Sequence, residues 1–168
     1  MANELKDEST KNLHEQYEKK KADCFAFDNE LSQLNQGFVQ KMNAIKTLQN
    51  DLVKLRSQYD KRIDAGDVKG ADGVLSDIAK ERKKLKILIE DLAKEGQLDE
   101  YKKRSESFNQ ETQRLYQKAR ENWQAALFLM NQTAALTGGI LQSFNHNFTE
   151  IEQIISAAKK LSEQIFEE

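Results

Sequence analysis

The chain has 168 residues, of which 32% are charged and 38% hydrophobic, and it contains no proline. Turns and strand edges rely on proline and glycine, so a sequence with seven glycines and no proline has few connections. The 26 basic and 28 acidic residues are interspersed and leave a net charge of −2. This balance argues against a nucleic-acid partner, which would select a basic face.

The residue usage predicts long helices. Ala, Glu, Lys, Leu, Gln and Arg are abundant, and these residues lose least on entering a helix. We therefore predict an all-α protein, an elongated antiparallel helical bundle or coiled coil of three or four long helices, in one domain over 1–168. The predicted helices cover about 11–64, about 68–95 and about 98–166, and a break near 137–139 in the last is an alternative.

The first predicted helix carries the most specific signal in the sequence. Apolar residues recur at a spacing of three and four from Leu13 to Tyr59, which is the 3.5-residue period of helices that supercoil around a partner. A helix over 11–64 would be roughly 80 Å long, which predicts an elongated molecule. The residues expected to form the helix–helix seam are Phe27, Leu31, Leu34, Phe38, Ile45, Leu48, Leu52, Leu55 and Tyr59.

Three basic residues, Lys20, Lys41 and Arg62, interrupt this stripe at intervals of 21 residues. Charged seam positions can set register or oligomeric state at a cost in stability. Alternatively, their long side chains extend to the edge of the bundle, which is the commoner outcome.

A short turn is predicted at 65–67. Gly66 can adopt the left-handed conformation that ends a helix, and Asp67 can accept hydrogen bonds from the first N–H groups of the next. Because this turn is short, the second helix is expected to run antiparallel to the end of the first. Its predicted stripe, at a spacing of four and three, is Ala71, Leu75, Ile78, Arg82, Leu85, Ile89 and Leu92.

The charged residues are distributed unevenly, since residues 1–121 carry 47 of the 54 charged side chains and residues 122–149 carry none. A helix without a charged face is expected to be surrounded, because desolvating an unpaired ion is costly. Its surroundings could be the centre of the bundle, an oligomer interface or, least favoured, a membrane. The apolar residues expected to face such a partner are Trp123, Leu127, Met130, Leu141, Phe144 and Phe148.

The sequence shows no catalytic, cofactor-binding or metal-binding pattern. His14 and His146 have no Glu or His at helical ligand spacing, and no glycine-rich phosphate loop is present. Cys24 is the single cysteine and falls on the stripe of the first helix, where a small buried hydrophobe fits. We therefore predict a protein that is not an enzyme and has no cofactor or metal.

These features predict a protein that acts through protein–protein association, as a scaffold, an assembly subunit or a chaperone-like partner. Its partner would be another protein or a second copy, bound through helices. The alternative is a membrane-active or exported secretion-system or pore-forming component that uses residues 122–149. The first twenty residues lack the apolar region of a signal peptide, so a cytoplasmic location is expected, with leaderless export as an alternative.

Overall fold

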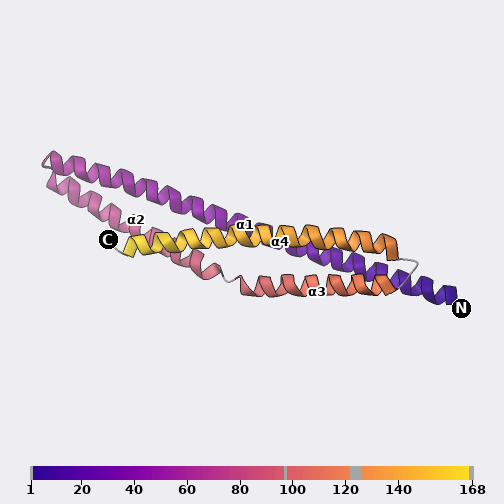
Figure 1. The fold of residues 1–168 in the computed structure, drawn as a ribbon. Helices are drawn as coiled ribbons and strands as arrows, with labels where there is room; N and C mark the ends of the chain where they lie inside the picture. Colours follow the sequence, from indigo (N-terminus) through magenta and orange to yellow (C-terminus); the bar gives the residue numbers. More distant parts are fainter. Residues whose placement is uncertain (1, 97, 122–125, 167–168) are drawn as a thin grey trace. The chain divides into compact units, whose positions relative to one another are not determined.

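The computed structural model describes residues 2–96, 98–121 and 126–166, and these residues form four helices. The helices are α1 (Ala2–Asp64), α2 (Val68–Glu95), α3 (Asp99–Glu121) and α4 (Ala126–Phe166) (Figure 1). None of the residues in these ranges lies in a strand, which confirms the predicted all-α helical bundle. The first helix begins earlier than predicted, at Ala2, and α2 has the predicted bounds.

The contacts within the chain divide it into two compact units. Unit 1 comprises Met1–Leu34 and Gln97–Thr149, and unit 2 comprises Asn35–Gly96 and Glu150–Glu168. The sequence predicts one domain over 1–168, which requires that the two units fold together. This stays a prediction.

In unit 1, the N-terminal part of α1 packs against α3 and against the N-terminal part of α4. Leu13, early in α1, shares a core cluster with Ala119 at the end of α3 and Leu129 at the start of α4. Phe27, later in α1, contacts Tyr101 at the start of α3 and Phe144 further along α4. Hence α3 runs antiparallel to α1, and α4 runs parallel to α1.

The predicted third helix is therefore two helices of opposite direction, with the reversal between Glu121 and Ala126. The alternative break at 137–139 is absent, because α4 continues as a helix through Gly138 and Gly139. The reversal lets the apolar residues of α4 pack along the same segment of α1 that α3 covers. Residues 122–125 contain no glycine, so the sequence gives no turn signal for this reversal of the chain.

In unit 2, the C-terminal part of α1 packs against α2 and the C-terminal part of α4. The Lys41 ammonium of α1 pairs with Glu95 at the end of α2, so these helices are antiparallel (Figure 1). The amide of Asn35 donates to Glu150, the first residue of unit 2 on α4, so the parts of α1 and α4 that belong to unit 2 begin side by side. The buried side chains of this unit are Phe38, Ile45, Ala71, Val74, Leu85, Ile89, Leu92, Ile151, Ile155 and Ala158.

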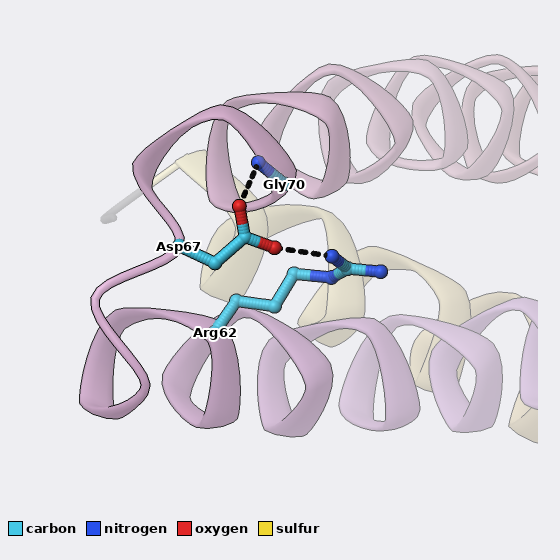
Figure 2. A network of polar contacts seen from close by, with 3 residues as sticks. All are labelled: Arg62, Asp67 and Gly70. Carbon is cyan, nitrogen blue, oxygen red and sulfur yellow. Dashed lines mark hydrogen bonds and ion pairs between the residues drawn. The ribbon is translucent and has the colours of Figure 1, made fainter.

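The turn between α1 and α2 has the predicted capping residues. Gly66 has φ of 73°, and the Asp67 carboxylate accepts the backbone N–H of Gly70 at 3.0 Å and Arg62 Nη1 at 2.6 Å (Figure 2). A Cβ on residue 70 would lie 2.1 Å from Asp67 Oδ2, so the carboxylate occupies the space that glycine leaves open. One short side chain thus caps α2 and pairs with the last turn of α1.

Candidate interaction surfaces

The predicted seam of α1 is buried against the chain's own helices over its first half. Phe27, Leu31, Phe38 and Ile45 are fully buried. Leu34, within this first half, is only half-buried. Burial weakens toward the end of the helix, where the predicted residues are all half-buried. These are Leu48, Leu52, Leu55 and Tyr59.

Phe27 lies at the centre of an aromatic cluster that joins the three helices of unit 1. Its ring centroid is 6.1 Å from that of Tyr101, 5.4 Å from that of Phe108 and 4.9 Å from that of Phe144. The Arg104 guanidinium lies 4.3 Å from the Phe27 ring centroid. This core is closed within the chain and leaves no seam for another helix at Phe27.

The predicted partner-facing residues of α4 do not share one face. Phe144 and Phe148 are buried, whereas Met130 and Leu141 are half-buried. Leu127 is 79% exposed. Trp123 lies outside the described residues.

The buried positions at the start of α4 are Leu129, Thr133 and Leu136, which the spacing analysis missed. Leu129 and Leu136 pack with Leu13 and Tyr17 of α1. The sequence could not show which residues at the start of α4 face the core, because residues 127–130 are all apolar and fit more than one helical stripe. The contact with α1 decides which of them is buried.

The opposite side of α4 in unit 1 is exposed and carries no charge, and we call it the α4 outer face. Its large apolar residue is Leu127, and small or amide-bearing residues make up most of the rest. Its residues are Leu127, Asn131, Ala134, Ala135, Gly138, Gly139, Gln142, Asn145 and His146. Where the structure describes the charge-free segment, it has a buried side and an exposed side, and the described part of the chain does not surround it.

The two glycines of the α4 outer face have no packing role in the described part of the chain. A Cβ added at Gly138 or Gly139 would meet no atom within 4 Å, apart from the helix's own backbone. Glycine in the middle of a helix costs about 1 kcal/mol relative to alanine. Nothing within the described residues offsets this cost.

The described residues assemble no group of metal ligands, and Cys24 is buried. Within the described ranges, no group of three or more His, Cys, Asp or Glu side chains is placed to hold a metal ion. Cys24 is buried, and desolvation, together with the nearby Asp23 carboxylate, raises the pKa of its thiol against the opposing effect of Lys20. Such a thiol is a poor nucleophile at neutral pH.

Among the helices as far as they are described, none has an 18-residue stretch apolar enough to cross a bilayer. Comparison with protein-family models, curated proteins and solved structures finds no match for this chain.

Proposed function

We propose that this protein works by association with other proteins through its helices and not by catalysis, and that the α4 outer face binds a second copy of the chain. The observation that carries the proposal is an exposed helix face that bears no charge in a protein with 26 basic and 28 acidic residues. Most exposed helix faces are charged, because charged groups gain from hydration.

The chemistry of the α4 outer face favours a second copy as its partner. Two copies of an uncharged face meet without like-charge repulsion, and no ion loses its hydration. The amides of Asn131, Gln142 and Asn145 each contain donors and an acceptor, so each can pair with an identical group. Exposed Ala135 and Gly139 would allow the two helices to approach closely.

The test is the molar mass in solution, measured by light scattering behind a sizing column over about a hundredfold range of concentration. We expect the wild-type mass to rise with concentration from the 19.4 kDa of one chain toward twice that value. Leu127→Asp should weaken the association about tenfold or more, because the interface would have to bury an ion. Ile87→Asp, at an exposed apolar position of α2, is the matched control and should behave as wild type.

A second variant pair separates association from folding. Gly139→Ala should stabilise the monomer by about 1 kcal/mol and weaken the association, whereas Gly73→Ala in α2 should only stabilise it. A wild-type mass that stays at 19.4 kDa at every concentration would overturn the proposal. So would an equal loss of association in Leu127→Asp and Ile87→Asp.

The alternative, a membrane-active protein, is favoured by one observation: Leu127 is a large apolar side chain with 79% of its surface exposed. In that case, the wild type should float with vesicles of phosphatidylcholine and phosphatidylserine, and Leu127→Asp should not. A wild type indifferent to the vesicles would exclude this alternative. The cytoplasmic location predicted from the sequence likewise stays a proposal.

A further inference from the structure

In unit 1, an open groove lies between the N-terminal part of α1 and the C-terminal part of α3, and we call it the α1–α3 groove. It encloses about 330 Å³. Each helix contributes side chains at spacings of three and four residues, which places them on one helix face. The charged residues that line the groove are Lys19, Lys20, Asp23, Glu111, Arg114 and Lys118.

The charges of the α1–α3 groove do not cancel. Its four cations and two carboxylates leave a net charge of +2, in a chain whose net charge is −2. The Lys20 ammonium pairs with Glu111 across the groove. The three other cations form no ion pair within the described residues, and they are Lys19, Arg114 and Lys118.

Several lysines elsewhere on the surface have a carboxylate partner on their own helix. Three such pairs join residues three positions apart, and they are Lys54–Asp51, Lys80–Asp77 and Lys84–Glu81. In the α1–α3 groove, by contrast, unpaired cations from two helices share one space, and each raises the electrostatic energy of the others. A bound anion would relieve this repulsion.

The arrangement of the cations favours linked phosphate groups as the anion. A guanidinium can donate two parallel hydrogen bonds to a phosphate, and an ammonium acts as a point charge beside it. Arg114 and Lys118 lie one turn apart on α3, roughly 6 Å, and Lys19 lines the groove from α1. A ligand with two or three linked phosphates can contact all three cations, whereas a single phosphate reaches fewer of them.

We infer that the α1–α3 groove binds a small anion with two or more linked or adjacent phosphate groups. The source is either a free polyphosphate compound or the headgroup of a phosphorylated lipid. Small-molecule pockets enclose roughly 300–1,000 Å³, and the groove falls at the lower end of this range. This site is formed by α1 and α3 and goes beyond the proposed self-association, which uses the α4 outer face.

The test uses the full chain and sodium tripolyphosphate, measured by isothermal titration calorimetry in about 50 mM sodium chloride. We expect one ligand per chain with a Kd below about 1 mM, and binding of inorganic orthophosphate that is about tenfold or more weaker. No saturable binding of tripolyphosphate up to about 10 mM would overturn the inference. Equal affinity for tripolyphosphate and orthophosphate would also overturn it.

Variants locate the binding. Arg114→Glu should weaken tripolyphosphate binding about tenfold or more, and because Arg114 is exposed, its change leaves the core intact. Lys103→Glu is the matched control, at an exposed position of α3 outside the groove. It lies roughly 16 Å along the helix from Arg114, beyond the screening length of about 14 Å, and should change the Kd less than about twofold. Equal effects of the two variants would contradict the α1–α3 groove as the site.

A gain of affinity keeps the test independent of folding. Asp23→Asn removes an exposed carboxylate that lines the groove and repels phosphate, so it should tighten tripolyphosphate binding several-fold. A variant that fails to fold cannot bind more tightly than wild type. Unchanged or weaker binding by Asp23→Asn would reject the inference.

Vesicles distinguish the two sources of phosphate. We compare flotation with phosphatidylcholine vesicles that contain or lack a bisphosphorylated phosphatidylinositol. Flotation that needs this lipid, and that both Arg114→Glu and added tripolyphosphate abolish, would support the site with a lipid headgroup as its ligand. Tripolyphosphate binding without flotation would support it with a free polyphosphate compound.

The proposed self-association is read separately, through Leu127→Asp and the molar mass. A dimer that forms while tripolyphosphate does not bind would reject the α1–α3 groove as a phosphate site and keep the α4 outer face. Tripolyphosphate binding by a chain that stays monomeric would do the reverse.

Discussion

At the scale of single residues, the basic interruptions of the α1 stripe each have an acidic partner on another segment. Lys20, Lys41 and Arg62 have side chains that are 21%, 34% and 49% exposed, so they lie at the edges of the units. Exposed ion pairs contribute little to stability, typically below about 1 kcal/mol. Their partners are Glu111, Glu95 and Asp67.

Asp67 gives a pH-dependent contribution to the stability of the turn between α1 and α2. The backbone N–H of Gly70, and next the Arg62 guanidinium, lower the pKa of its carboxyl below the ordinary value of 3.8. A carboxyl whose pKa is lowered on folding stabilises the fold above its unfolded pKa, and this contribution is lost as the pH falls below that value.

Asp67→Asn tests this, because the amide oxygen can still cap α2 but carries no charge. We expect wild type to resist urea better than Asp67→Asn at pH 7, and the difference between their midpoints to shrink as the pH falls below about 3.8. The measurement is urea unfolding followed by circular dichroism. The same difference at pH 7 and pH 3 would show that the charge has no role.

At the scale of elements, the packing of α1, α3 and α4 in unit 1 depends on one aromatic side chain. Phe27 contacts the rings of Tyr101 and Phe108 on α3 and that of Phe144 on α4, so its removal leaves a cavity bordered by all three helices. Cavities of this kind are expensive because the surrounding helices relax only in part.

Phe27→Ala should lower the free energy of unfolding by about 3–5 kcal/mol. The matched control is Phe25→Ala, two residues earlier on the same helix, where half of the side-chain surface is exposed. This control should change the free energy of unfolding by about 0.5 kcal/mol or less. Equal losses in the two variants, measured by urea unfolding, would mean that Phe25 is covered in solution, for example by a second copy.

At the scale of the whole molecule, the distribution of charged residues decides how salt affects the proposed self-association. The chain carries 54 charged side chains, but the α4 outer face has none. Salt screens interactions between exposed charges and leaves contacts between uncharged groups nearly unchanged.

Raising sodium chloride from about 50 mM to about 500 mM shortens the screening length from about 14 Å to about 4 Å. We expect self-association to change by less than about twofold, because the contact is between uncharged groups. Light scattering over a salt series would measure this change. Self-association that disappears in high salt would place the contact on a charged surface instead of the α4 outer face.

The amino-acid sequence by itself determined the all-α class, the bounds of α2 and the capped turn at Gly66 and Asp67. These features are local, because helix propensity, the period of apolar residues and capping side chains act within a few residues. The stripe of α1 belongs with them, since its apolar spacing is regular enough to define one buried face from Leu13 to Ile45.

Only the tertiary structure decided two other features. They are the chain reversal between Glu121 and Ala126 and the burial of Leu129 in place of Leu127. In α4, residues 127–130 are all apolar and fit several helical phases, so the choice among these phases comes from contact with α1, which lies far away in the sequence.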